Sequence, residues 1–304
     1  MEYITATFYK FFPMENSEEM QILFRGLCEE CRLKGRILLG REGVNGGVSG
    51  NIENLEKFKK ILKKNPNFSG LTFREQQTKE NSYKKLVVRI REEVVVFGKE
   101  VDVNNAAEYV SSDELKKWID SGEEIVLLDT RNNYEFDIGR FKGARGLPIE
   151  NFRELPEAVE KLSDIKNKKI VTYCTGGIRC EKATAYMKML GFNNLFQLKG
   201  GIIDFVNKFP GQDFEGGLFV FDDRLVADTG SYKKLGKCRI CGILCNDYTD
   251  CYNLDCDNLF ICCQNCRIKM NNACCEECRN AKRQRNTVKS PTDYKNFVAP
   301  RYII

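Results

Sequence analysis

The sequence predicts a mixed α/β and α+β protein with three parts along the chain. Apolar runs alternate with amphipathic helix patterns between residues 125 and 209, which is typical of an α/β domain with a parallel sheet. The first 97 residues show a separate β-α-β-β-α-β order, and the end of the chain is rich in cysteine. We therefore expect one domain over residues 1–98, a linker over 99–112, a second domain over 113–211 and a cysteine-rich, basic region over 212–304.

The first domain is expected to be ferredoxin-like or acylphosphatase-like, because its elements follow the order of that plan. Its first helix follows Asn16 and Glu19, a helix-capping pattern, and is expected to end at Gly35. This plan hosts many functions, including RNA binding, so it does not define one by itself. The expected strands are Tyr3–Phe12, Arg36–Gly40, Val44–Ser49 and Leu86–Phe97, and the expected helices are Met20–Leu33 and Ile52–Lys64.

The second domain is expected to carry polar residues at the carboxyl edge of its parallel sheet, where sites gather. A continuous apolar run from Ile125 ends there in Asp129-Thr130-Arg131. The other expected strands are Lys169–Tyr173 and Leu195–Leu198, and the expected helices are Phe152–Leu162, Glu181–Leu190 and Ile202–Phe209.

The loop from Cys174 to Arg179 has the composition of a site for a reactive thiolate. Cys174 ends a strand, a Gly-Gly pair follows, and Arg179 precedes a helix whose free N–H groups point at the sulfur. The six-residue span from cysteine to arginine favours sulfur chemistry over phosphate binding; the alternative is an inert core cysteine. The nearby Cys180 is interpreted as the helix start rather than a resolving thiol. The candidate catalytic residues are Cys174, Arg179, Asp129 and Arg131, and the candidate anion-binding loop residues are Thr175, Gly176, Gly177 and Ile178.

Composition excludes several classes of protein. The chain has no histidine, which excludes mechanisms that need imidazole as a base or metal ligand. No apolar run is long enough to suggest a membrane span, and the start lacks the order of a secretory signal, so a cytoplasmic protein is expected. In a reducing compartment, fifteen cysteines are expected to be metal ligands or catalysts rather than disulfides. No pattern in the sequence predicts an oligomeric state.

Three Cys-x-x-Cys pairs near the end of the chain suggest metal binding. A pair at this spacing places two thiolates on one metal, and without histidine any such site must be all-sulfur. Structural zinc is one interpretation; reduced thiols packed in place and an iron–sulfur cluster are the others. The pairs are Cys238 with Cys241, Cys263 with Cys266 and Cys275 with Cys278, and the first four of these cysteines are the candidate zinc ligands.

Two segments suggest RNA binding. Arg41 lies in a glycine-rich stretch, residues 38–50, that either approaches a phosphodiester backbone or forms a tight turn at Asn45-Gly46. A basic run, residues 279–289, suits phosphate contacts, although a solvated helix end has the same composition. The aromatic residues that follow either stack on bases or pin the tail to the body. The candidates are Arg41, Lys282, Arg283 and Arg285, with Tyr294, Phe297 and Tyr302 as the aromatic residues.

The second domain resembles a rhodanese domain. The matching motifs are Asp129-x-Arg131, Gly139-x-Phe-x-Gly143-Ala144 and Cys174-Thr-Gly-Gly-Ile-Arg179. The histidine usual before the Gly-Ala pair is Arg140 or Phe141 here.

The whole chain resembles the rhodanese-domain tRNA uridine hydroxylases. Beyond the rhodanese motifs, the match is carried by Ile37–Gly50, Lys84–Gly98, Gln197-Leu-x-Gly-Gly201, and Leu218-Phe-Val-Phe-Asp222-x-Arg224 with its cysteine-rich tail. The family tail often contains histidine, and this one does not.

The resemblance implies O2-dependent 5-hydroxylation of the wobble uridine, position 34, in the anticodon region of tRNA. It also implies that Cys174 is essential, as a persulfide. The reductant is unknown, because the sequence has neither a dinucleotide-binding fingerprint nor a histidine–carboxylate iron site. Our hypothesis is that Cys174 attacks C6 of uridine. One alternative is a rhodanese-type sulfurtransferase that uses thiosulfate or a protein persulfide, and another is a catalytically idle RNA-binding protein.

Overall fold

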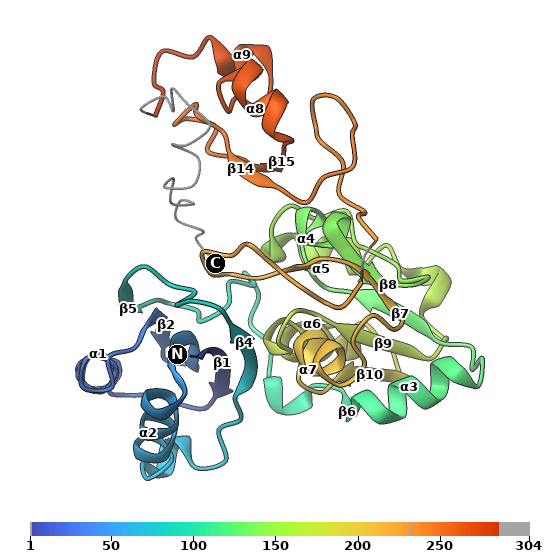
Figure 1. Cartoon of the computed structure of the whole chain (residues 1–304). Helices are drawn as coiled ribbons and strands as arrows, with labels where there is room; N and C mark the ends of the chain where they lie inside the picture. The colour runs from blue at the N-terminus through green and yellow to red at the C-terminus, as the bar shows by residue number, and fades with distance from the viewer. Residues whose placement is uncertain (1, 232, 286–304) are drawn as a thin grey trace. The chain divides into compact units, whose positions relative to one another are not determined.

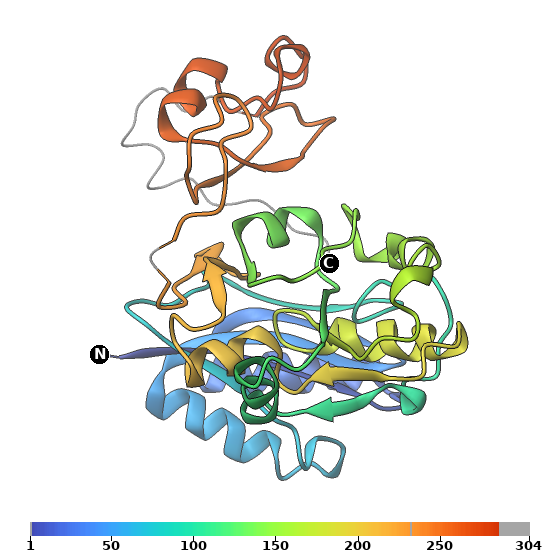
Figure 2. The ribbon, with the colours of Figure 1, turned by 90° about the vertical axis from the view of Figure 1, so that its right-hand side faces the viewer.

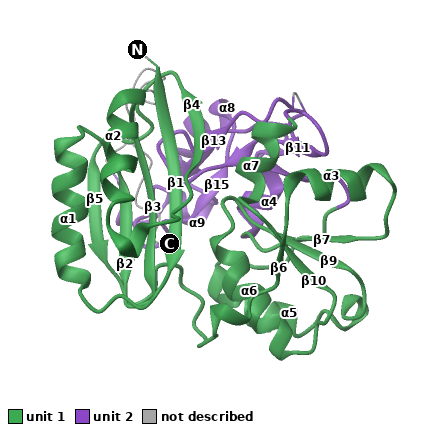
Figure 3. Ribbon diagram, turned by 90° about the horizontal axis from the view of Figure 1, so that it is seen from below, with its two compact units in different colours: residues 1–131, 144–209, 304 green, residues 132–143, 210–303 purple. Residues whose placement is uncertain are grey.

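The computed structural model describes residues 2–231 and 233–285, which form two compact units. Unit 1 contains residues 1–131 and 144–209, and unit 2 contains residues 132–143 and the chain from 210 on (Figure 3). Within the described residues, no helix combines the length and apolar character needed to cross a membrane.

Unit 1 begins with a five-stranded sheet in the order β4-β1-β3-β2-β5. Alternate residues of β1, including Ile4, Ala6 and Phe8, share a core with Phe24 of α1 and Phe58 of α2, so both helices cover the same face (Figure 1). The first four strands and two helices make the ferredoxin-like plan, as expected. The elements are β1 (Tyr3–Phe11), α1 (Ser17–Glu30), β2 (Lys34–Gly40), β3 (Gly43–Asn51), α2 (Ile52–Leu62), β4 (Arg74–Thr78) and β5 (Leu86–Ile90).

Strand β4 is absent from the sequence-based prediction. Strand β4 lies at the edge of the sheet, and its residues, Arg74–Thr78, are polar throughout. They therefore lack the apolar alternation by which a strand is recognised in a sequence. The strand expected over Leu86–Phe97 is β5, which is a fifth strand beyond the four of the ferredoxin-like plan. It pairs in parallel with β2 and ends at Ile90 rather than Phe97.

Two expectations based on glycine were wrong. Helix α1 ends at Glu30, Arg32 adopts the left-handed conformation of the turn, and Gly35 lies inside β2. Asn45 and Gly46 form no turn but lie inside β3, where a Cβ on Gly46 would approach the Phe8 ring to 2.8 Å. The glycine is needed there for close packing rather than for a positive φ.

The second sheet of unit 1 is four-stranded and wholly parallel, in the order β6-β10-β9-β7, as expected for the α/β domain. Helices α3 and α7 cover one face, and α5 and α6 cover the other (Figure 3). The expected helix Phe152–Leu162 is broken into a 3-10 turn and a short helix. The elements are β6 (Glu108–Val110), α3 (Ser112–Asp120), β7 (Val126–Asp129), α5 (Leu155–Val159), β9 (Ile170–Tyr173), α6 (Ile178–Met189), β10 (Leu195–Leu198) and α7 (Gly201–Lys208), with 3-10 turns at Pro66–Phe68, Val103–Asn105, Phe152–Glu154 and Ser163–Ile165.

Lys182 joins the two sheets of unit 1. It lies on α6 with 3% exposure, and its Nζ donates to Glu42 Oε1 at 3.0 Å, to Glu93 Oε2 at 2.6 Å and to the Val95 carbonyl at 3.0 Å. All three ammonium hydrogens therefore have acceptors, which allows a buried charge to be stable.

Unit 2 is built from short two-stranded sheets and short helices, and its cysteine-rich segment is coloured orange to red in Figure 2. Its core combines Phe219 and Tyr248 with nine buried or partly buried cysteines of the 238–278 segment and with Ile138. The elements are α4 (Asn133–Ile138), β8 (Gly139–Phe141) paired with β11 (Phe214–Gly216), β12 (Leu218–Phe219) with β13 (Val226–Ala227), β14 (Tyr248–Asp250) with β15 (Leu259–Ile261), α8 (Gln264–Met270) and α9 (Glu276–Arg279).

Candidate active site

The Cys174 loop connects β9 to the N-terminus of α6. Cys174 is 1% exposed, and its Sγ accepts a hydrogen bond from the Gly177 N–H at 3.1 Å. Gly177 is the N-cap of α6 with φ of 102°, a conformation that L side chains rarely adopt. The loop therefore turns so that a backbone donor points at the sulfur.

Helix α7 holds the loop from its other side. The N–H groups of Ile202 and Ile203 donate to the carbonyls of Cys174 and Thr175 at 3.0 and 3.1 Å. A Cβ on Gly201 would lie 2.5 Å from the Cys174 carbonyl oxygen, so this approach requires glycine. Two helix N-termini thus fix the loop, one at the sulfur and one at the carbonyls.

The surroundings of Cys174 favour its thiolate. Burial acts to raise the pKa of Cys174, but a hydrogen bond with Cys180, the charge of Arg179 and the N–H groups of Arg179 and Gly177 outweigh burial and lower it to about 5. Burial and the neighbouring Cys174 raise the pKa of Cys180, which therefore stays a thiol. At neutral pH the site contains a nucleophilic sulfur.

The sequence suggested only that Cys180 marks the start of a helix. The structure gives it a further role. It is fully buried, its Sγ lies 3.6 Å from the Thr130 hydroxyl, and it hydrogen-bonds Cys174. The structure thus makes it a donor to the reactive sulfur.

The other candidate catalytic residues are buried around the loop. Arg179 is 5% exposed, and its Nη2 lies 3.4 Å from the Thr175 hydroxyl. Asp129 and Arg131 are both 0% exposed and form a salt bridge with Nη2 2.6 Å from Oδ2. Because both carboxylate oxygens of Asp129 accept hydrogen bonds from the Arg131 guanidinium, the pair is suited to positioning the strand ends.

Sequence reasoning missed a polar group beside the loop that comes from the first sheet. Arg74 of β4 is 7% exposed, and its guanidinium carbon lies 4.7 Å from the Tyr9 ring centroid. A Cβ built on Gly176 would meet the Arg74 Cδ at 3.8 Å and the Thr7 Oγ1 at 3.9 Å. Arg74 Nε and Nη1 and Thr7 Oγ1 are buried without a hydrogen-bond partner among the described residues. No signal could have found Arg74, because its strand has no strand pattern.

A buried carboxylate links both sheets next to this group. Glu181 of α6, 8% exposed, accepts hydrogen bonds from the hydroxyls of Tyr9 (2.9 Å) and Tyr109 and from Gln197 Nε2 (3.1 Å). Burial and the charge of Glu181 raise the pKa of both tyrosines. In the sequence, Gln197 was noted only as part of a segment that resembles the hydroxylase family. Its hydrogen bond to Glu181 explains why a polar residue is buried at this position.

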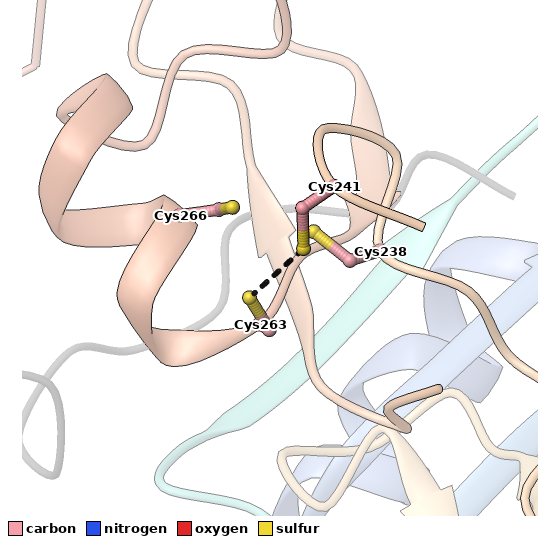
Figure 4. A group of neighbouring side chains, drawn as sticks. All are labelled: Cys238, Cys241, Cys263 and Cys266. Atoms are coloured by element: carbon pink, nitrogen blue, oxygen red, sulfur yellow. Dashed lines mark hydrogen bonds between the residues drawn. The ribbon is translucent and has the colours of Figure 1, made fainter. Parts of the chain in front are cut away.

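The four candidate zinc ligands converge in unit 2. The Sγ atoms of Cys238, Cys241, Cys263 and Cys266 all lie within 4.8 Å of one another, and those of Cys241 and Cys263 are 3.7 Å apart (Figure 4). The third expected pair, Cys275 with Cys278, was wrong, because Cys275 joins no such group within the part of the chain that the structure describes. Cys274 takes its place, in a second group with Cys251, Cys256 and Cys278.

The candidate RNA-binding residues are partly described. Arg41 is exposed in the turn between β2 and β3. Arg283 and Arg285 form ion pairs with Asp255 and Asp257, and Lys282 is exposed. The aromatic residues Tyr294, Phe297 and Tyr302 lie outside the described residues.

Comparison with family models defines the class of protein. Residues 3–94 match the UPF0176 acylphosphatase like domain, residues 111–208 the rhodanese-like domain and residues 215–279 the rhodanase C-terminal domain. The chain is thus a rhodanese-domain protein with an acylphosphatase-like domain before that domain, which confirms the expected fold class.

Relatives define the family. The chain is 39% identical over 83% of its length to a tRNA uridine(34) hydroxylase of Cytophaga hutchinsonii, covering 82% of that protein. It is 44% identical over 74% of its length to one of Legionella pneumophila, covering 90%, and 36% identical over 94% to one of Bacillus mycoides, covering 92%. The chain belongs to the tRNA uridine(34) hydroxylase family, so the resemblance seen in the sequence is confirmed.

Proposed function

We propose that this chain hydroxylates C5 of uridine 34 in tRNA, in an O2-dependent reaction that proceeds through Cys174. The observation that supports this most directly is the stabilised thiolate at the α6 N-terminus, in a chain whose relatives are named for this activity. Uridine 34 lies in the single-stranded anticodon loop, where a base is unstacked at low cost. The expected compartment is the cytoplasm.

The chemistry begins with sulfur, as a thiolate or as the persulfide of Cys174. Sulfur bonds to C6, and the electron pair of the C5–C6 double bond moves toward C5 and the C4 oxygen. C5 then takes one oxygen atom, and loss of its proton breaks the C6–S bond and returns the electron pair to sulfur. Uridine, O2, two electrons and two protons give 5-hydroxyuridine and water, so a two-electron reductant is required.

The polar group beside the loop is suited to bind uracil during this reaction. Negative charge develops on the C4 oxygen when sulfur adds to C6, and preorganised donors stabilise such charge. Arg74 Nε and Nη1 are buried donors without a partner among the described residues, and the Thr7 hydroxyl lies beside the same glycine of the loop. We assign Arg74 and Thr7 to the uracil carbonyl, with Tyr9 and Glu181 positioning the guanidinium. Asp129, Arg131 and the loop residues Thr175, Gly176, Gly177 and Ile178 would hold the sulfur in place.

Binding of tRNA is assigned to basic residues that are exposed or partly exposed, and zinc binding is assigned to the first cysteine group. Arg41, Lys282, Arg283 and Arg285 would contact phosphates of the anticodon region. The exposed ion pair of Arg283 with Asp255 is of a kind that is weak and exchanges readily. Cys238, Cys241, Cys263 and Cys266 suit a structural zinc ion, since four converging thiolates are a tetrahedral donor set.

The test is mass spectrometry of nucleosides from tRNA incubated with the protein and a reductant in air. We expect uridine 34 to gain one oxygen, and Cys174→Ser to lose this product, while Cys28→Ala, changed in the core of the first domain, keeps it. Product formation under strictly anaerobic conditions, or in Cys174→Ser, would exclude the proposed reaction. Thiosulfate-dependent sulfur transfer without hydroxylation would instead identify a sulfurtransferase.

A further inference from the structure

We propose that unit 2 binds two metal ions rather than one, and that Cys251, Cys256, Cys274 and Cys278 form a second tetrathiolate zinc site that is interleaved with the first. This site was not predicted from the sequence. The inference does not depend on the hydroxylation reaction.

The spacing of the sulfur atoms fits one shared ion. With Zn–S bonds of about 2.3 Å, a tetrahedron places its sulfurs about 3.8 Å apart. In the second group, the Sγ of Cys274 lies 3.8 Å from that of Cys256 and 3.6 Å from that of Cys278, and all four sulfurs are within 4.8 Å of one another. The first group shows the same spacing, with 3.7 Å between Cys241 and Cys263.

This spacing argues against the other uses of four cysteines. Disulfide bonds need sulfurs about 2.05 Å apart, and they would leave four sulfurs in two pairs rather than one mutual group. A four-iron cluster binds each thiolate to a different iron, so its thiolates are farther apart than ligands of one ion. A single tetrahedral ion explains the arrangement, and zinc is the natural occupant of an all-thiolate tetrahedron.

The order of the ligands along the chain interleaves the two sites. The first and third pairs of cysteines, 238 with 241 and 263 with 266, belong to one group, and the second and fourth, 251 with 256 and 274 with 278, belong to the other. Each site therefore closes a loop that contains a ligand pair of the other site. Such cross-bracing explains how a segment with only two short strands and two short helices holds a defined structure.

The local structure supports the second group. Cys278 lies on α9, and its Sγ accepts a hydrogen bond from Asn253 Nδ2 at 3.4 Å, a contact that orients a ligand sulfur. Asn253 belongs to the segment that carries Cys251 and Cys256. The Sγ of Cys275 lies 4.0 Å from that of Cys274 and contacts Glu277, but Cys275 is not one of the four cysteines whose sulfurs all lie within 4.8 Å of one another.

The second site also holds the basic run. The Leu254 N–H donates to the Arg283 carbonyl at 2.9 Å, and the Arg285 N–H donates to the Tyr252 carbonyl at 2.8 Å. Residues 283–285 therefore pair with the loop that joins two ligands, Cys251 and Cys256. Binding of Zn²⁺ replaces four thiol protons by one ion and leaves a site of charge −2, so loading the site releases protons and fixes this loop.

The experiment measures metal content of the full chain, purified with reductant, by elemental analysis and native mass spectrometry. We expect two zinc ions per chain, a loss of at least one in Cys256→Ser, and two again in Cys256→His, because imidazole also binds zinc. Cys275→Ser, which changes the adjacent cysteine outside both groups, should keep two. One zinc in the unchanged chain, with no loss in Cys256→Ser, would contradict the proposal, and so would equal losses in Cys256→Ser and Cys275→Ser.

A second readout needs no variant. Cys256 is exposed, so as a free thiol it would react rapidly with an alkylating reagent. We expect peptide mapping to show Cys256 protected in the zinc-loaded chain and reactive after a strong chelator is added. Rapid alkylation before chelation would overturn the proposal even if the variants fail to fold.

Discussion

At the scale of single residues, the reactivity of Cys174 depends on a few close contacts. Burial alone would make this thiol inert, and the hydrogen bond with Cys180, the charge of Arg179 and two N–H groups reverse that effect. The loop residues and their spacing were predicted from the sequence, since strand, glycines, arginine and helix are contiguous. The contribution of Cys180 was not predicted, because a hydrogen bond between cysteines six residues apart depends on the turn of the loop.

Replacing Cys180 should raise the pKa of Cys174. A hydrogen bond to a charged group contributes about 1.5–3 kcal/mol, which corresponds to about one to two pH units. We expect the pH of half-maximal alkylation of Cys174, followed by peptide mass spectrometry, to rise by that amount in Cys180→Ala from about 5 in the unchanged chain. Cys180→Ser keeps a donor and should shift less. An unchanged pH profile in Cys180→Ala would show that Cys180 does not stabilise the thiolate.

Arg74 should matter for catalysis and not for folding. Removing one donor that stabilises developing negative charge typically lowers kcat by about 10²–10³. We expect a loss of this size in Arg74→Met, with a free energy of unfolding that is unchanged or higher, because a buried guanidinium with unpartnered nitrogens is costly. Strong destabilisation together with normal turnover would assign Arg74 a structural role.

At the scale of elements, buried strands and helices were predicted well from the sequence, and the edge strand of the first sheet was not predicted. Strands β9 and β10 and helix α6 follow from continuous apolar runs and helix-length segments. Strand β4 was missed because none of its residues is apolar, and with it Arg74 was missed. The grouping of cysteines could not be predicted from spacing, since Cys274 and Cys275 are neighbours and only packing separates them.

The contact of α6 with the first sheet should depend on Lys182 and on pH. Removing the ammonium leaves Glu42 and Glu93 partly buried without their charged partner. Breaking a fully buried pair costs about 3–5 kcal/mol, and the cost is smaller here because both carboxylates are partly exposed to solvent. We expect Lys182→Met to lower the urea midpoint at pH 7, followed by the fluorescence of the single tryptophan, Trp118. Lys188→Met, an exposed lysine on the same helix, should have little effect.

The loss of stability in Lys182→Met should become smaller in acid. Burial acts to raise the pKa of Glu93, but hydrogen bonds from Lys182 and from two N–H groups lower it below its ordinary value of 4.5. A carboxyl with a depressed pKa stabilises the fold above its unfolded pKa and loses that contribution as pH falls through the folded pKa. The difference between Lys182→Met and the unchanged chain should therefore narrow as pH falls below 4.5, the ordinary pKa of this carboxyl. A constant difference from pH 7 to pH 3 would assign the effect to packing alone.

At the scale of the whole molecule, the domain content and the family were predicted from sequence, because each domain carries its own contiguous motifs. The second cysteine group and the polar residues beside the Cys174 loop were not, because each joins segments far apart in the chain. Both lie where three-dimensional packing, rather than local pattern, brings side chains together.

Binding of tRNA should depend on salt through the basic residues of unit 2. Each phosphate contact to a single strand contributes about −0.7 to the slope of log affinity against log salt. We expect the combined change of Lys282, Arg283 and Arg285 to alanine to reduce the slope by up to about two. Fluorescence titration of an anticodon stem-loop at several salt concentrations measures the slope of log affinity against log salt. An unchanged slope would place the contacts elsewhere.

The central claim, that Cys174 sulfur adds to C6 of uridine 34, is tested most directly by trapping. In a tRNA anticodon stem-loop with 5-fluorouridine at position 34, C5 carries no proton. Once C5 has taken oxygen, the proton loss that normally releases the sulfur therefore cannot occur. The account predicts a covalent RNA–protein adduct, mapped by mass spectrometry to Cys174 with or without one extra sulfur, and absent in Cys174→Ser. Full hydroxylation of normal tRNA without any adduct at Cys174 in the fluorinated substrate would contradict the account.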